Sequence, residues 1–239
     1  MSEERPESPR KTLVFTITTG RSGTVFLSDL LARNLPDAQV YHERTGSLEF
    51  GADTPDAGEL KQFNTYGYTE RVRAFGQRKF ERAIGEPGHY YAEVSHFLAK
   101  AGLVEGLLDH LPQDVAVKLV YLYREPEKIA LSFYNRGVFE NLGWTWLFTL
   151  DPRYPNVLVR PDAFRQYGTM GWSLWYVTEM QARAAYYRAL VWGREIAGGH
   201  VDAPLGRHAQ DRRRQVVRPD GRRALTHYRI NRRLAGSTL

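Results

Sequence analysis

Residues 12–31, TLVFTITTGRSGTVFLSDLL, leave this chain few choices of fold. The run at 13–18 is short, apolar and rich in β-branched side chains, which predicts a buried strand. A helix over about 23–34 is predicted from leucines at helical spacing: Leu27, Leu30, Leu31 and Leu35. A loop between a strand and a helix leaves backbone N–H groups free at the positive end of the helix dipole, which favours a bound anion. We therefore expect an α/β protein with an anion site at this loop.

The loop carries side chains suited to phosphate. Gly20 and Gly23 let the backbone approach an anion closely. Ser22 and Thr24 offer hydroxyl donors, and Arg21 adds a planar, permanently charged guanidinium. The spacing is shorter than the Walker A pattern G-x-x-x-x-G-K-[ST], and an arginine stands in place of its lysine. So short a motif is also compatible with a plain helix cap.

Strands and helices alternate beyond this segment. We predict strands over 37–43, 89–98 and 115–123, and helices over about 70–84, 103–111, 124–137 and 169–190. This alternation predicts a parallel sheet with helices on its faces, whose ligands bind outside the carboxyl ends of the strands. The loop at 20–24, Glu43, the region of His96 and Arg124 all fall at the carboxyl ends of predicted strands, so we expect them at one edge of the sheet. The aromatic stripe of the last helix is interpreted as core: Trp172, Trp175, Tyr176, Met180 and Tyr187.

Composition bounds the class of protein. The chain has 239 residues, 42% of them apolar, and no cysteine, which excludes disulfides, zinc–thiolate sites and a cysteine nucleophile. No apolar run is long enough to cross a membrane, and the opening MSEERPESPRK lacks the apolar stretch of a signal peptide. We therefore expect a cytoplasmic protein. We divide it into a disordered lead at 1–11, an α/β domain at 12–198 and an arginine-rich segment at 199–239.

The net charge of +6 is concentrated in residues 199–239, which hold ten arginines, three aspartates and no lysine or glutamate. Such a segment could be a nucleic-acid-binding arm, but Tyr228 is its only aromatic ring besides histidines. We interpret it as a solvated tail and do not expect a nucleic-acid partner. The abrupt change of composition also suits a truncated or frame-shifted C-terminus.

A second candidate anion site follows the strand predicted over 115–123. Arg124 stands at the end of that strand, and Ser132 follows two helical turns later. Taken singly, they are also explained as a surface arginine and a serine bonded to its own helix backbone. Together with the loop at 20–24, the pair favours a ligand with two separate phosphates.

The two motifs, TTGRSGTVFLSDLL and YREPEKIALSFY, resemble the 5′-phosphosulfate loop and the 3′-phosphate motif of sulfotransferases. These enzymes use 3′-phosphoadenosine 5′-phosphosulfate (PAPS) as co-substrate. The resemblance covers about 13–137 and implies a P-loop-like three-layer fold that transfers a sulfuryl group to an acceptor hydroxyl or amine. It implies that Arg21 neutralises the bridging oxygen and that Arg124 and Ser132 hold the 3′-phosphate. The loop residues implied to hold the 5′-phosphosulfate group are Gly20, Arg21, Ser22, Gly23 and Thr24.

The same resemblance implies a general base after the second strand. Glu43 is the first choice for that base and His42 the second. His96 could hold the leaving sulfuryl group or the acceptor, or be a polar loop residue. The acceptor is expected to be a small molecule, carbohydrate or lipid, and no metal is expected. Beyond the long helix the family's further strand is missing, and RPDGRR, residues 218–223, matches its basic loop only weakly.

Two other functions stay open. The first is a P-loop nucleotide kinase or other phosphotransferase, against which the missing Walker lysine and the lack of a clear strand-end aspartate for magnesium both argue. The second is a non-catalytic protein that binds adenosine phosphates or, through its basic tail, nucleic acid.

Overall fold

The structure is a computed structural model that describes residues 11–42, 50–110, 112, 114–142 and 149–197. The chain divides into one unit over Met1–Gly206 and a second over Arg207–Leu239. The second unit lies entirely outside the described residues, so the fold below is that of the first. Glu43, the expected base, also lies outside the described residues.

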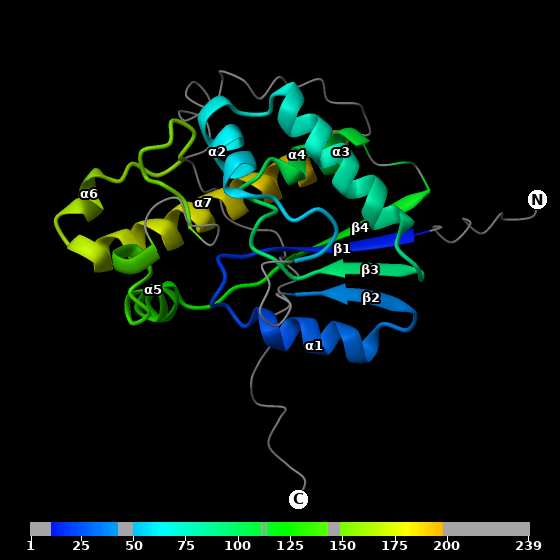
Figure 1. Ribbon diagram of the computed structural model, residues 1–239, viewed down its shortest axis with the longest axis horizontal. Coiled ribbons are helices and arrows are strands. Elements are labelled where there is room, and N and C mark those ends of the chain that lie inside the picture. Colours follow the sequence, from blue (N-terminus) through cyan, green and yellow to red (C-terminus); the bar gives the residue numbers. More distant parts are fainter. Residues whose placement is uncertain (1–10, 43–49, 111, 113, 143–148, 198–239) are drawn as a thin grey trace, which may run out of the picture. The chain divides into compact units, whose positions relative to one another are not determined.

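A parallel sheet forms the centre of the first unit (Figure 1). Its strands are β1 (Lys11–Ile17), β2 (Ala38–Tyr41), β3 (Tyr90–Glu93) and β4 (Val115–Tyr121), in the order β2-β3-β1-β4. All the pairings are parallel, and the longest joins β1 to β4 from Lys11↔Val115 to Ile17↔Tyr121. Every residue of β1 is buried, as is typical of a central parallel strand, although Lys11, Thr12 and Thr16 are polar. The carboxyl ends of the strands therefore meet at one edge of the sheet.

Helices flank this sheet. They are α1 (Thr24–Asn34), α2 (Ala57–Tyr66), α3 (Glu70–Gly85), α4 (Leu103–His110), α5 (Pro126–Tyr134), α6 (Asp162–Arg165) and α7 (Gly168–Ala197), with a π-helical turn at Val138–Leu142. In Figure 1, α1 runs along β2, which it contacts, and α2, α3 and α4 are grouped on the other side. The expected α/β class, with a central parallel sheet and flanking helices, is confirmed.

The strands and long helices lie where the sequence predicts them, with two differences. Helix α2 was not predicted, although Asp56 and Glu59 form a capping box that marks its start. Each side chain accepts the backbone N–H of the other residue, at 2.9 Å in both directions. The third strand is shorter than predicted, because the chain leaves the sheet after Glu93 while remaining buried. Burial, rather than pairing, explains the apolar character of residues 94–98.

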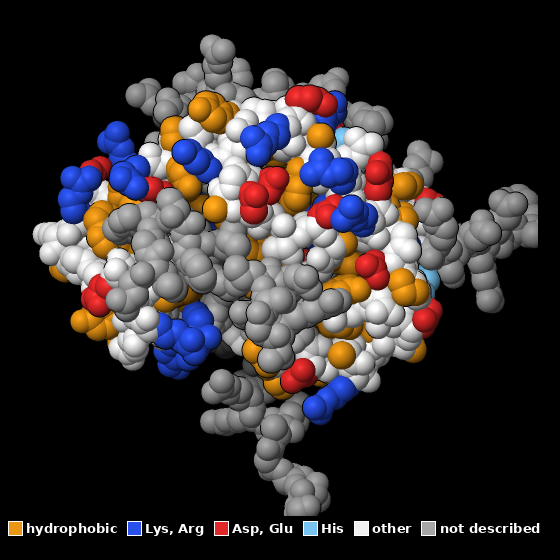
Figure 2. Space-filling model, in the orientation of Figure 1, with side chains coloured by type: hydrophobic (Ala, Val, Ile, Leu, Met, Phe, Trp, Pro, Cys, Tyr) orange, Lys and Arg blue, Asp and Glu red, His pale blue; other side chains and the backbone are white. Residues whose placement is uncertain are grey.

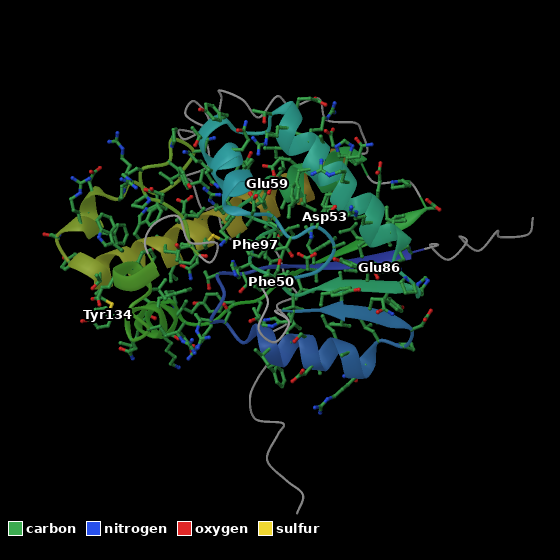
Figure 3. All side chains as sticks on the ribbon, in the orientation of Figure 1. Phe50, Asp53, Glu59, Glu86, Phe97 and Tyr134 are labelled. Carbon is green, nitrogen blue, oxygen red and sulfur yellow. The ribbon has the colours of Figure 1, made fainter. Side chains whose placement is uncertain are left out.

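The aromatic stripe of α7 packs in the core, as predicted. Trp175, Tyr176, Met180 and Tyr187 are each at most 3% exposed, and Trp172 is partly buried against the same core. Figure 3 shows Phe50 and Phe97 near the middle of the molecule, where their rings meet edge to face at 4.9 Å. Among the described residues, no helix is both long enough and apolar enough to cross a membrane.

Candidate functional site

The loop between β1 and α1 has the backbone of a tight turn. Gly20, Arg21 and Gly23 have φ angles of 77°, 54° and 102°. Glycine is required at position 23 by its backbone conformation and not by lack of space, because an added Cβ would have no heavy atom within 4 Å. Arg21 takes the left-handed conformation as an L residue, which costs roughly 1–2 kcal/mol. Because such strain persists only where surrounding contacts hold it, the loop is fixed by its neighbours.

Hydroxyl groups hold the inside of this loop. Ser22 Oγ accepts a bond of 2.8 Å from Thr18 and donates one of 2.9 Å to the carbonyl of Gly20. Thr19 donates to the same carbonyl at 2.6 Å. The side chain of Ser22 is buried, so it shapes the loop from within. Thr24, half-buried, begins α1 immediately after the turn.

The expected arginines and the expected serine meet at this loop. Arg21 Nε donates to Ser132 Oγ of α5 at 3.0 Å, and Arg124 Nη1 donates to the backbone carbonyl of Arg21 at 2.8 Å. We call Arg21, Arg124 and Ser132 the arginine cluster. Figure 2 shows Lys and Arg side chains gathered on the surface between α5 and α1. The fold thus brings residues far apart in the sequence into one partly exposed, positively charged group.

Tyr176 of α7 supports the cluster from the core side. Its hydroxyl donates to the carbonyl of Thr19 at 3.3 Å and accepts from Lys100 Nζ at 3.4 Å. Its ring also packs edge to face on Phe133, the residue after Ser132, with centroids 5.3 Å apart. The sequence predicted Tyr176 only as a core residue, because helical spacing indicates which face of a helix is buried but not which partner a hydroxyl group will bond.

Two histidines lie behind the loop. His96 is buried, and its ring contacts those of Phe50 and Phe97 at 5.6 and 4.4 Å. Burial lowers the pKa of His96 well below its usual value, and the charges of Lys100 and His42 lower it further. His96 is therefore a neutral ring against the loop, where a Cβ at Gly20 would lie 3.6 Å from its Cδ2. His42 is half-buried, with its ring 6.2 Å from that of Phe50.

A buried ion pair stands at the end of β3. Lys79 Nζ of α3 lies 2.7 Å from Glu93 Oε2, and both side chains are at most 1% exposed. Tyr91 and Ser95 also donate to the Glu93 carboxylate, at 2.9 and 3.0 Å. With its partners supplied by the fold, this pair is structural. Within the described residues, no three His, Asp or Glu side chains gather in a way that could hold a metal ion.

Fold and cluster together define an α/β protein with a candidate phosphate site at the carboxyl edge of its sheet. No family model matches the chain, and no solved structure matches it. Part of the chain is similar to RNA pseudouridine synthases. It is 44% identical over 64 residues to ribosomal large subunit pseudouridine synthase D of Xanthomonas campestris pv. campestris, and 52% identical over 56 residues to an uncharacterized RNA pseudouridine synthase of Chloroflexus aurantiacus. The pseudouridine synthase D of Pseudomonas aeruginosa is 39% identical over 64 residues.

These matches cover only part of this chain and only part of each relative. They cover 26%, 23% and 26% of this chain, and 19%, 18% and 20% of the relatives in the same order. The chain thus spans about a fifth of the length of the curated relatives it matches. A match of this length is shorter than the described α/β unit.

The names of these relatives contradict the expected sulfotransferase family and its PAPS co-substrate. The kinase alternative gains no support from them either. The physical reason for the error is that arginines and serines in such motifs are typical of phosphate sites in general, and phosphate belongs to the RNA backbone as well as to PAPS. Motifs this short can suggest an anion site, but they do not identify the molecule that carries the anion.

The expected partners are corrected in the same way. Instead of a small-molecule, carbohydrate or lipid acceptor, the relatives are named for RNA. We discounted nucleic acid because residues 199–239 hold a single Tyr, Phe or Trp ring. That criterion was too strict, because phosphate neutralisation by arginine and lysine supplies most non-specific affinity for nucleic acid.

Proposed function

We propose that this chain binds RNA and acts in the class of the RNA pseudouridine synthases. The similarity of 44% over 64 residues to a pseudouridine synthase D is the observation that carries the proposal. The activity of that class is the isomerisation of a uridine in RNA, in which the bond from the ribose to N1 of uracil is replaced by one to C5. It consumes no second substrate. An enzyme that acts on RNA in this way is expected in the cytoplasm.

The arginine cluster is our candidate for the contact with RNA phosphates. Two guanidinium groups lie together there, and Arg21 Nε reaches Ser132 at 3.0 Å while Arg124 reaches the loop carbonyl at 2.8 Å. These bonds hold the two side chains in place, and guanidinium groups bind phosphate oxygens through charge-assisted hydrogen bonds. Gly20, Ser22, Gly23 and Thr24 shape the loop, whose backbone N–H groups would add to the site.

The arginine-rich segment supplies a second electrostatic contribution. Its ten arginines against three aspartates give it a net charge of +7, whereas the whole chain carries +6. Such a segment raises affinity for any RNA and steers association, without reading the base sequence. We therefore expect the segment to add to the RNA affinity of the full chain.

RNA binding of the full chain is the decisive experiment. Fluorescence anisotropy of a labelled single-stranded RNA should show binding whose affinity falls linearly with salt on a logarithmic scale. Arg124→Ala should weaken binding about tenfold, because one charged hydrogen bond to phosphate is lost. Arg165→Ala is the matched control, since Arg165 is 71% exposed on α6 and lies 4.0 Å from Asp162. Equal effects of the two variants would show that the arginine cluster is not the RNA contact. Absence of binding by the wild type would contradict the proposed RNA binding altogether.

The isomerase activity has its own assay. Uridine labelled with tritium at C5 loses the label when C5 becomes bonded to the ribose, so tritium release from labelled ribosomal RNA reports the reaction. Tritium release that requires the intact protein would support the isomerase activity. Binding without release would leave an RNA-binding protein that does not catalyse the isomerisation.

A further inference from the structure

Most of the exposed large apolar side chains in the described part of the chain lie on α5 and on elements next to the residues of the arginine cluster. Six of the eight large apolar side chains that are exposed in the described part of the chain lie on α1, directly after β4 or on α5. They are Val25, Phe26, Leu30, Tyr123, Leu131 and Tyr134. The other two, Tyr66 and Tyr167, lie on α2 and just before α7. Exposed apolar side chains that concentrate on neighbouring elements can mark a binding surface.

Tyr123 has the most direct relation to the cluster. It is 71% exposed and immediately precedes Arg124, whose guanidinium is fixed to the carbonyl of Arg21 at 2.8 Å. Its own position is fixed as well, because the preceding residue, Leu122, donates its N–H to the carbonyl of Ile17 at 3.2 Å. The ring therefore projects from a backbone held at the carboxyl edge of the sheet.

Rings are also exposed on α1, which follows the loop that holds Arg21, and on α5, which carries Ser132. Phe26, 58% exposed, follows the loop by one half-turn of α1. Tyr134, 43% exposed, lies on α5 two residues after Ser132 (Figure 3). An arginine pair for phosphates with exposed rings on each neighbouring element is the combination that single-stranded nucleic acids require. Arginines follow the backbone, and aromatic faces stack on unpaired bases.

We propose that the arginine cluster and Tyr123 form a binding site for single-stranded RNA, in which a base stacks on the Tyr123 ring beside the phosphate held by Arg124. This inference rests on the proposed function and specifies its substrate as unpaired RNA. In a duplex the bases are stacked on each other and their faces are closed to a side chain. Phe26 and Tyr134 extend the surface along the strand.

The test compares two short single strands in the full chain: oligouridine, and an oligomer with the same sugar–phosphate backbone but no bases. The wild type should bind oligouridine more tightly than the abasic strand and than a duplex of equal length. Tyr123→Ala should weaken oligouridine binding roughly five- to a hundredfold, the range expected for the loss of one stacked base. Binding of the abasic strand should stay as in the wild type.

Three further variants isolate the stacking. Tyr123→Trp should retain the affinity and Tyr123→Leu should lose it, because leucine keeps apolar area without an aromatic face. Tyr66→Ala, at a ring 66% exposed on α2, should change nothing. Full affinity of Tyr123→Leu would overturn the inference in favour of a general apolar contact, such as a protein or lipid would use.

Failure of this inference can be distinguished from failure of RNA binding itself. If the wild type binds both strands equally and Tyr123→Ala binds like the wild type, the stacking site is wrong while the RNA proposal stands. If the wild type binds neither strand, both are wrong. Thermal unfolding of each variant checks folding, and an exposed ring should be replaceable with little loss of stability.

Discussion

The hydroxyl of Tyr176 donates to the backbone carbonyl of Thr19 at 3.3 Å, which ties the long helix α7 to the loop that follows β1. The ring of the same residue packs on Phe133 of α5, with centroids 5.3 Å apart. One core residue therefore contacts both elements whose side chains form the arginine cluster. The position of Arg21 relative to Ser132 depends on this contact as well as on their own hydrogen bond.

Replacing Tyr176 by phenylalanine should test that dependence. The ring is retained, but the buried carbonyl of Thr19 loses its partner, which should cost about 1–2 kcal/mol of unfolding free energy. Urea denaturation followed by circular dichroism measures this loss. RNA affinity should also fall, though by less than in Arg124→Ala, since both arginines remain. Tyr167→Phe, at a side chain 61% exposed, is the control and should leave both quantities unchanged.

The fold was largely predictable because its signals are local. The run at 13–18 and the leucines after it gave β1 and α1 directly, and Pro126 marked the start of α5, where it occupies the first turn. Helix α2 escaped prediction because its segment is polar and shows weak periodicity. The capping pair Asp56 and Glu59 was the available signal.

The candidate site was likewise predictable only in part. Arg21, Arg124 and Ser132 were proposed from sequence as phosphate contacts, and the fold brings them within hydrogen-bond distance of one another. Tyr176 and Tyr123 were not proposed, because their relation to the loop depends on tertiary placement that spacing along the chain does not report. The wrong family came from a related limit: a short motif can suggest an anion site, but it says nothing of the rest of a ligand.

Stability should depend on pH through Glu105. Burial raises the pKa of its carboxyl to about 7, although hydrogen bonds from its own backbone and Tyr187 and the charge of Arg183 act in the opposite direction. Its Oε1 accepts from the Tyr187 hydroxyl at 2.9 Å, while Oε2 is buried without a hydrogen bond within the described residues. A carboxyl whose folded pKa is raised favours the folded state while it is protonated. That contribution is complete below about pH 4 and is lost as pH rises through 7.

The expected loss between these limits is about 3 kcal/mol, from the difference between the usual glutamate pKa and the raised value. Urea unfolding at a series of pH values measures it. Glu105→Gln keeps an acceptor for Tyr187 but cannot ionise, so this variant should show a much flatter profile and exceed the wild type in stability above pH 7. Parallel profiles for the two proteins would show that Glu105 is not the group responsible.

The buried pair of Lys79 and Glu93 should be costly to break from one side. Lys79→Met leaves the Glu93 carboxylate buried without its cation, which should destabilise the protein by about 3–5 kcal/mol. Adding Glu93→Gln removes the uncompensated charge and should recover part of that loss. Unfolding free energies of the wild type, both single variants and the double variant give the coupling energy. Strict additivity would indicate that the two side chains do not interact.

The capping box of α2 predicts a smaller effect. Asp56→Ala removes the side chain that accepts the N–H of Glu59 at 2.9 Å, and the loss of such a cap costs about 1 kcal/mol. Asp56→Asn keeps a side-chain oxygen in the same place and should cost much less. Urea midpoints of the two variants decide the matter, and equal destabilisation would mean that the charge, and not the cap, matters.

The arginine-rich segment should contribute to RNA binding in proportion to its charge. Replacing Arg212, Arg213 and Arg214 by glutamine removes three adjacent positive charges. For a single strand, each phosphate contact contributes about 0.7 to the slope of log affinity against log salt, so the slope should fall by up to about 2. Anisotropy titrations at several salt concentrations measure this slope.

If these arginines contact phosphate, combining their replacement with Arg124→Ala should lower the slope further, because the cluster and the segment lie in separate parts of the sequence. An unchanged slope in the triple variant would assign the RNA contacts to the α/β unit alone. An unchanged slope in Arg124→Ala, with a reduced slope in the triple variant, would assign them to the segment.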